Sequence, residues 1–175
     1  MKVTPTHLDG VFVVQNKKFE DHRGLFVKAY HEEIFRDAGI DTDFKESFYS
    51  ISKKGVLRGM HFQLPPHDHA KLVYVTDGEV LDVAVDIRKN SPTFGQYFST
   101  ILSSENVKSL YIAKGFAHGF LTLSECATVV YLTSTVHSPE SELGISWDSF
   151  GFNWQECSPI MSERDKNLLK ISNLN

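Results

Sequence analysis

The stretch VLRGMHFQLPPHDHAKL, residues 56–72, places three histidines and two cations in a segment that is otherwise typical of β-sheet. His61 alternates with the apolar Met60 and Phe62, so a strand would direct its imidazole away from both. A neutral imidazole is a suitable general base, because the pKa of histidine lies near working pH. Lys71 opens the next apolar run, within hairpin reach of His61 if QLPPHDHA forms the loop. The segment predicts proton-transfer chemistry or metal binding, and a purely structural sheet histidine is the alternative.

The metal hypothesis depends on the H-x-H pair His67 and His69, which resembles the histidine pair of metal-binding cupins. His118 follows a Gly turn in AKGFAHG, as the later histidine of such a site does. The acidic ligand that should follow the pair is missing, and Lys71 stands in this region instead. An ammonium would repel a divalent ion unless it were neutralised. The sequence therefore predicts no metal, with both histidines in a polar loop after two prolines, and metal binding is kept as an alternative.

Size and composition favour one ordinary globular domain spanning residues 1–175. Hydrophobic residues make up 41% and charged residues 23% of the chain, and the net charge is -4. An acidic balance disfavours nucleic acid or an anionic membrane as a partner. No apolar run approaches a membrane span of roughly 20 residues, and MKVTPTHLDG has no apolar signal core, so a cytoplasmic location is expected. Cys126 and Cys157 are too few for a disulfide framework and are predicted to be free thiols.

Runs of β-branched and aromatic residues dominate the middle of the chain. KLVYVTDGEVLDVAVDIR, residues 71–88, predicts a hairpin around the turn Asp77-Gly78. Three further runs predict short strands, which are typical of a sandwich or barrel: 96–103, 109–123 and 127–138. Helical patterns are confined to residues 31–39, which end in a glycine, and to 162–170, where Ser162 and Asp165 form an approximate capping box. The predicted fold is mostly β with short peripheral helices.

Five segments together resemble the dTDP-4-dehydrorhamnose 3,5-epimerase family of nucleotide-sugar enzymes: FEDHRGLF, SKKGVLRGMHFQ, KLVYVTDGEVLDVAVDIRKNSPTFGQ, LSSENVKSLYIAKGFAHGFLTLSE and PIMSERD. They run through nearly the full chain. The resemblance implies a cupin-like jelly roll (a double-stranded β-helix), no metal or other cofactor, and a homodimer whose subunits exchange N-terminal strands. It also implies epimerisation at C3 and/or C5 of a nucleoside-diphosphate 4-keto-6-deoxyhexose, in deoxysugar, O-antigen or capsule biosynthesis.

Such a reaction needs a base on one face of the sugar, an acid on the other, and a cation near O4. The protons at C3 and C5 are acidic because losing either gives an enolate delocalised onto O4. By resemblance, His61 matches the base, Asp165 the carboxylate that orients it, Tyr131 the proton donor and Lys71 the cation. From the residues alone, Asp165 would be a helix cap, Tyr131 a sheet tyrosine and Lys71 a solvated lysine.

Substrate binding is assigned by the same resemblance. Arg23 and Arg58 match the arginines that hold the diphosphate, since a guanidinium suits phosphate oxygens. A glycine follows each of them and would let a ligand approach the backbone. His118 matches a histidine that positions the sugar. The remaining matched positions line the pocket: Gln63, Glu142 and Arg164, the last replacing a more usual lysine.

Three departures from the family bear on specificity. Lys28 stands where many members have a glutamate that accepts the N3 proton of thymine, and Glu46-Ser47-Phe48 replaces a Q-x-N stretch near the nucleotide. Cytosine N3 is an acceptor, so Lys28 favours a CDP-linked substrate, unless Lys28 and Glu46 form an ion pair with each other. His137 stands where a second tyrosine near the sugar is common, which leaves open whether C3, C5 or both are inverted.

Three other functions fit part of the pattern. A 3,4-ketoisomerase on the same scaffold also begins by removing the C3 proton, but His61 and Tyr131 together favour an epimerase. A metal-dependent cupin enzyme is the second alternative. A sugar-binding module without turnover is the third, and the complete set of His61, Asp165, Tyr131 and Lys71 argues against it.

Overall fold

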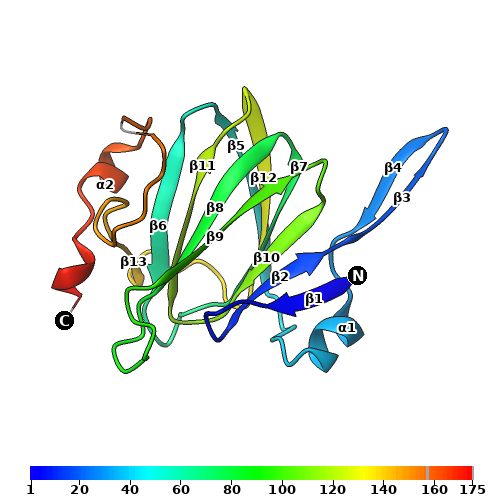
Figure 1. Cartoon of the computed structure of the whole chain (residues 1–175). Helices are drawn as coiled ribbons and strands as arrows, with labels where there is room; N and C mark the ends of the chain where they lie inside the picture. Colours follow the sequence, from blue (N-terminus) through cyan, green and yellow to red (C-terminus); the bar gives the residue numbers. More distant parts are fainter. Residues whose placement is uncertain (157, 175) are drawn as a thin grey trace.

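Two antiparallel sheets face each other in the computed structural model, which describes residues 1–156 and 158–174 (Figure 1). Cys157 lies outside the described residues, and Cys126 is a free, exposed thiol. The first sheet has the order β1 (Lys2–Pro5), β2 (Val11–Gln15), β10 (Lys108–Ile112), β7 (Lys71–Asp77), β12 (Cys126–Thr133), β5 (Glu46–Lys53). The second has the order β13 (Glu142–Gly144), β6 (Leu57–Gln63), β11 (Phe116–Thr122), β8 (Glu79–Asp86), β9 (Tyr97–Ser103). The predicted mostly β, cupin-like jelly roll is confirmed.

The predicted hairpin at residues 71–88 is wrong, although both of its strands form. β7 pairs with β10 and β12, whereas β8 pairs with β9 and β11 in the other sheet. Gly78, with φ +76°, turns the chain from one sheet to the other, and a Cβ there would lie 2.0 Å from the carbonyl oxygen of Cys126. Alternating hydrophobicity identifies a strand but not its partner, so a sheet-crossing corner and a hairpin turn look the same in the sequence.

The space between the sheets is filled by apolar side chains from both, among them Val73, Leu110 and Phe120. The outer face of the five-stranded sheet is also covered, because the C-terminal segment packs Ile145 and Trp154 against Val83 and its neighbours. β8 is therefore buried on both faces. Polar side chains that β8 and β11 carry inward are consequently removed from water and need partners.

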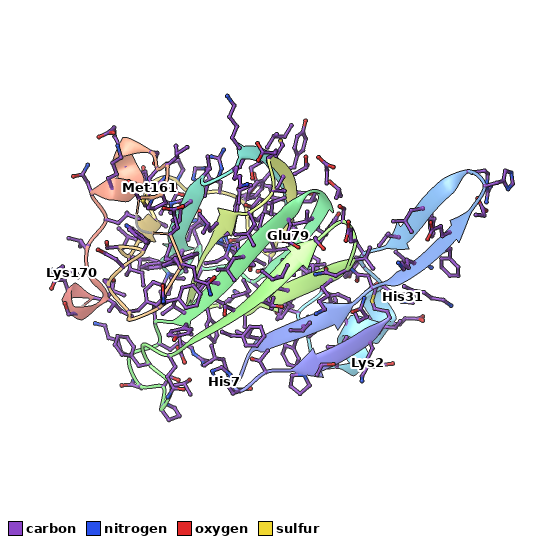
Figure 2. The ribbon with its side chains drawn as sticks, turned by 45° about the horizontal axis from the view of Figure 1, so that its top comes forward. Lys2, His7, His31, Glu79, Met161 and Lys170 are labelled. Carbon is purple, nitrogen blue, oxygen red and sulfur yellow. The ribbon has the colours of Figure 1, made fainter. Side chains whose placement is uncertain are left out.

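A two-stranded sheet of β3 (Lys17–Asp21) and β4 (Gly24–Lys28) projects away from the barrel as a hairpin in both views (Figures 1 and 2). It exposes large apolar side chains, including Phe19 and Phe26, whose rings contact each other. An isolated hairpin is only marginally stable in water, and exposed apolar surface of this kind marks an interaction site.

Short helices lie at the periphery, as predicted: α1 (Glu32–Asp37), α2 (Glu163–Lys166) and the 3-10 helix η1 (Ile171–Asn173). The chain turns at Gly39, φ +73°, after α1. α2 is shorter than the predicted 162–170, because Leu169 forms a bridge with Ile145. Within the described residues, no helix has the length and apolar character to cross a membrane.

Candidate active site

A cavity of about 760 Å³ is lined by strands of both sheets and by the segment 160–165, which leads into α2. Met161, labelled in Figure 2, is part of this lining segment. Twelve of the fourteen predicted site residues line the cavity: His61, Tyr131, Asp165, Lys71, Glu46, Phe48, Arg58, Gln63, His118, His137, Glu142 and Arg164. The fold thus brings together side chains that the sequence places on separate elements.

His61 on β6 and Asp165 on α2 form a hydrogen-bonded pair, with 2.7 Å between Nε2 and Oδ1. The second carboxylate oxygen accepts from the backbone N–H of Gly59 at 3.3 Å. Burial by itself would raise the pKa of Asp165, but the contacts with His61 and Gly59 lower it, so the carboxylate remains charged behind the ring. Nδ1 of His61 has no hydrogen-bond partner within the described part of the chain, which leaves it able to accept a proton.

The start of α2 directs Asp165 toward His61. The Ser162 hydroxyl accepts from the backbone N–H of Asp165 at 3.1 Å and caps the helix. Of the predicted capping box, this bond to the Ser162 hydroxyl forms, whereas the return bond from the Asp165 side chain does not. The alternative in which the Asp165 side chain serves as a helix cap is wrong, because the backbone of this residue makes the cap bond and its carboxylate contacts the imidazole.

Lys71 begins β7, and its Nζ donates to the carbonyl oxygen of His61 at 3.2 Å. The predicted hairpin relation between these residues is wrong, since β6 and β7 belong to different sheets and the lysine spans the space between them. Burial lowers the pKa of Lys71 to about 8, while Asp82 and Glu142 oppose that shift. The cavity therefore holds an ammonium that is charged at neutral pH and lies against the backbone of His61.

Tyr131 lies on β12, in the sheet that faces β6, and is only 7% exposed. Its hydroxyl lies 3.5 Å from the Ser50 hydroxyl on β5, and its ring is stacked on Phe48. Burial raises the pKa of Tyr131, so the phenol keeps its proton at neutral pH. An acid on one wall and a possible base on the other are what proton delivery and proton removal on opposite faces of a ligand require.

A second histidine–aspartate pair is buried beside this constellation. Nε2 of His118 lies 3.0 and 2.9 Å from the two carboxylate oxygens of Asp82, and neither residue is appreciably exposed. Asp82 was missed from the sequence as a site residue. The sequence feature that could have identified Asp82 is its position between Val80 and Ala84 on the inward face of β8. A carboxylate buried there must find a partner.

Glu142 connects two further predicted residues at the cavity. Its Oε1 lies 2.9 Å from Nη2 of Arg164, and its Oε2 lies 2.9 Å from Nε2 of His137. Burial would raise the pKa of Glu142, but the hydrogen bonds with Arg164 and His137 lower it to about 2. The carboxylate therefore stays charged and joins β13, α2 and the segment after β12 into one wall.

Glu46 belongs to the same wall, since its Oε2 accepts from the backbone N–H of His137 at 3.0 Å. Lys28 lies elsewhere, opposite Lys17 on the projecting hairpin. Within the residues described, the alternative of a Lys28–Glu46 ion pair is therefore not realised in one chain.

Gln63 lines the cavity, but its amide is engaged by neighbouring loops. Nε2 donates to the carbonyl oxygen of His67 at 2.6 Å and lies 3.2 Å from Nδ1 of His69, while Oε1 accepts from the backbone N–H of Ser138 at 2.7 Å. Its contacts make Gln63 a support for these loops. His69 is part of the cavity wall rather than a bystander in a polar loop, and burial lowers its pKa to about 3.

The H-x-H pair does not converge, since His67 contacts the Ser141 hydroxyl and His69 contacts Gln63. Across residues 1–156 and 158–174, no group of three His, Cys, Asp or Glu side chains is arranged to hold a metal ion.

Of the two arginines predicted for the diphosphate, only Arg58 lines the cavity, where its Nε donates to the Ser52 hydroxyl at 2.9 Å. Arg23 lies at the turn of the projecting hairpin, 79% exposed and paired with Asp21. Together with Lys28, it is absent from the lining of the cavity in its own chain.

The glycine after Arg58 has a packing role that was not predicted from the sequence. A Cβ on Gly59, whose φ is +142°, would lie 2.6 Å from the Cα of Gly119, so the glycine allows β6 and β11 to pack closely. At Gly24 no described atom lies within 4 Å of the position that a Cβ would take, and approach of a ligand to its backbone stays a prediction.

Comparison with known proteins agrees with this architecture. The family model described as dTDP-4-dehydrorhamnose 3,5-epimerase matches residues 5–173. Curated proteins of that name are 44% identical over 170 residues in Shigella flexneri (95% of this chain, 94% of the relative) and 45% identical over 169 residues in Salmonella typhimurium (94% and 92%).

Solved structures give the same match in three dimensions. A dTDP-6-deoxy-D-glucose-3,5-epimerase from Legionella pneumophila, in complex with dTDP-4-keto-L-rhamnose, superposes with a TM-score of 0.94 at 36% identity and covers 99% of this chain and 94% of that one. A 3'-monoepimerase from Streptomyces bikiniensis in complex with dTDP-quinovose gives 0.90 at 32% identity, covering 96% and 87%.

Proposed function

This chain belongs to the dTDP-4-dehydrorhamnose 3,5-epimerase family, and on that premise we propose that its cavity inverts C3, C5 or both in a dTDP-linked 4-keto-6-deoxyhexose. One observation carries the proposal. The pair His61–Asp165 and the neutral phenol of Tyr131 line the same cavity from facing sheets, with the Lys71 ammonium beside them. The product would serve the synthesis of deoxysugar polymers such as O-antigen or capsule.

Proton removal is the first step of the proposed reaction. Nδ1 of His61 takes the proton from C3 or C5, and the electron pair of the broken C–H bond moves through the adjacent carbonyl to O4. Asp165 stabilises the imidazolium that forms. Lys71 donates a hydrogen bond to O4, where negative charge develops, and such a preorganised cation acts most strongly in a site with little water.

Proton delivery completes the inversion. Tyr131 donates its phenolic proton to the opposite face of the enolate carbon, and the O4 electrons return to the carbonyl. The phenolate and the imidazolium then exchange protons with solvent, which restores both groups. Burial keeps the phenol protonated until an enolate carbon, a strong base, is formed beside it.

Deuterium exchange tests this function directly. The enzyme is incubated with dTDP-4-keto-6-deoxyglucose in deuterated water, and NMR reports the label at each carbon. Label with inversion at C3, C5 or both supports the proposal. Formation of a 3-keto sugar with label at C4 would instead indicate the ketoisomerase, and absence of label at C3, C4 and C5 would indicate a binding module.

The number of centres inverted is an open part of the proposal. The fold does not decide it, since solved structures of similar architecture include a 3,5-epimerase and a 3'-monoepimerase. In this chain His137 occupies the position where a second tyrosine was expected, and its imidazole is bound to Glu142. The same deuterium experiment reports both carbons separately.

The base of the nucleotide is proposed to be thymine, since the named relatives act on dTDP sugars. A preference for cytosine through Lys28 stays a prediction. Lys28 lies on the projecting hairpin, so it meets a nucleotide only if the hairpin reaches a cavity. Comparing the binding of CDP and dTDP decides between the two bases.

The loss of activity at alkaline pH should follow the deprotonation of the Lys71 ammonium. Only the ammonium stabilises O4, and this form is lost above a pKa of about 8. We expect kcat to fall by up to about tenfold per pH unit above that pH. A pH–rate profile measures this. In the matched variant Lys71→Arg, whose guanidinium stays charged, the alkaline fall should vanish while the absolute rate is lower. An unchanged alkaline fall in Lys71→Arg would assign it to another group.

We also propose that the enzyme is a homodimer in which the hairpin of one subunit completes the cavity of the other. β5 lines the cavity and ends the six-stranded sheet, and it exposes Tyr49 and Ile51 on its outer face. The hairpin exposes apolar side chains of its own and carries Arg23 and Lys28. Exposed strands and apolar patches of this kind support pairing between two copies.

Mixing two inactive variants tests the exchange. Arg23→Ala removes a diphosphate contact from the hairpin, and His61→Asn removes the base from the cavity. If hairpins are exchanged, half of randomly mixed dimers are hybrids with one intact site each, and about a quarter of wild-type activity returns. The control is each variant alone. A mixture with no more activity than its components would mean that each hairpin serves its own chain or none.

A further inference from the structure

The ring of Phe48 lies flat on the ring of Tyr131, with 4.7 Å between centroids and 17° between planes. The two residues are direct partners in the register of β5 and β12. Such a cross-strand aromatic pair fixes the relative orientation of two rings. Phe48 nevertheless remains 45% exposed and lines the cavity together with Tyr131, so it covers one face of the tyrosine ring instead of being buried in the core.

Packing, and not hydrogen bonding, determines where the phenol of Tyr131 points. Among the described side chains its hydroxyl has a single hydrogen-bond partner, the Ser50 hydroxyl. The distance between the two oxygens is 3.5 Å, which is long for an O–H···O bond. The ring lies edge-on to His118, with centroids 6.2 Å apart. His118 is itself fixed by Asp82, so one neighbour of the phenol is rigid, and Phe48 supplies the contact on a ring face.

We propose that Phe48 is a positioning residue that holds the Tyr131 phenol in line with the enolate carbon and so determines how often an enolate is inverted. The inference rests on the proposed function. Sequence resemblance placed Phe48 among the residues that bind substrate; the contact with Tyr131 gives it a role in proton delivery instead.

The chemical consequence is a partition of the enolate between two proton donors. The imidazolium of His61 can return a proton to the face from which it was taken, which regenerates the substrate. Tyr131 can deliver a proton to the opposite face, which gives the epimer. In deuterated water the first route yields labelled substrate and the second yields labelled product. A misplaced phenol therefore raises the ratio of labelled substrate to product, even when proton removal is unaffected.

Phe48→Leu keeps an apolar side chain in the strand but removes the flat face. We expect product formation to fall about tenfold, as for the loss of an aromatic contact, with the ratio of labelled substrate to product rising by a similar factor. Phe48→Tyr keeps the ring and should restore the wild-type ratio. A change in KM alone, with the ratio unchanged, would overturn the proposal and return Phe48 to substrate binding. Equal losses of exchange and product in a fully folded Phe48→Leu would overturn it as well.

A measurement that needs no turnover tests the contact between Phe48 and Tyr131 independently of the proposed reaction. If the wild-type enzyme exchanges neither carbon, the proposed function fails, yet the contact can still be tested by ultraviolet titration of the tyrosinate. In each background the Tyr131 signal is isolated as the difference from the same protein carrying Tyr131→Phe, which cancels the tyrosine that Phe48→Tyr adds. Removing the ring of Phe48 exposes the phenol to water, so its titration should move to lower pH in Phe48→Leu and not in Phe48→Tyr. Titration at the same pH in Phe48→Leu and the wild type would show that Phe48 does not cover the phenol.

Discussion

His61→Asn is expected to lower kcat by about a thousandfold, because it removes the basic nitrogen while keeping a side chain of similar size. Asparagine can still contact Asp165, so the wall of the cavity should keep its shape. Deuterium exchange at both C3 and C5 should disappear together with epimerisation, since proton removal precedes both. Steady-state kinetics and NMR of the same sample measure the two effects.

Binding of dTDP serves as the control for His61→Asn, and it should be unchanged within about twofold because the proposed complex places the imidazole against the sugar and not the nucleotide. If the variant still exchanged the C3 or C5 proton at close to the wild-type rate, another residue would be the base. Lys71, whose ammonium lies against the backbone of His61, would be the first candidate.

Tyr131→Phe should separate exchange from inversion. The variant keeps the ring that stacks on Phe48 but has no proton to deliver, so epimerisation should fall by about a hundredfold or more. Proton removal by His61 is intact, and deuterium should still enter the substrate without inversion. The expected result is a large rise in labelled substrate relative to product, read by NMR at each carbon.

Tyr97→Phe is the matched control for that variant. Tyr97 packs against Phe150 and Phe152 in the aromatic cluster near the C-terminus and does not line the cavity, so its hydroxyl should be dispensable. Parallel loss of exchange and inversion in Tyr131→Phe would mean that the phenol acts before the enolate forms, which would contradict its assignment as the donor.

Local features of the fold could be predicted from the sequence, whereas the pairing of strands could not. β-branched and aromatic runs located β7, β8, β9 and β12, and a glycine marked the end of α1. Period-two alternation carries no information on which sheet a strand joins, so β7 and β8 were paired incorrectly. The relation of His61 to Lys71 changed for the same reason, from hairpin neighbours to a contact between facing sheets.

The candidate site was predictable where a residue matched a family pattern, and less so where its role depends on a contact. The buried partner of His118 was missed, because Asp82 resembles any polar residue of a half-exposed strand until both faces of β8 are seen to be covered. The stacking of Phe48 on Tyr131 depends on the register of two strands that are distant in sequence. Arg23 and Lys28 lie outside the cavity because the hairpin that carries them leaves the barrel, a direction that a local pattern does not encode.

The central claim is that His61 and Tyr131 hold a 4-keto sugar between them with O4 on Lys71. A crystal structure of the double variant His61→Asn, Tyr131→Phe with dTDP-4-keto-6-deoxyglucose tests it most directly. We expect the sugar ring between residues 61 and 131, with C3 or C5 facing both side chains and O4 within about 3 Å of the lysine Nζ. A sugar bound with both reactive carbons turned away from either side chain, or outside this cavity, would contradict the account.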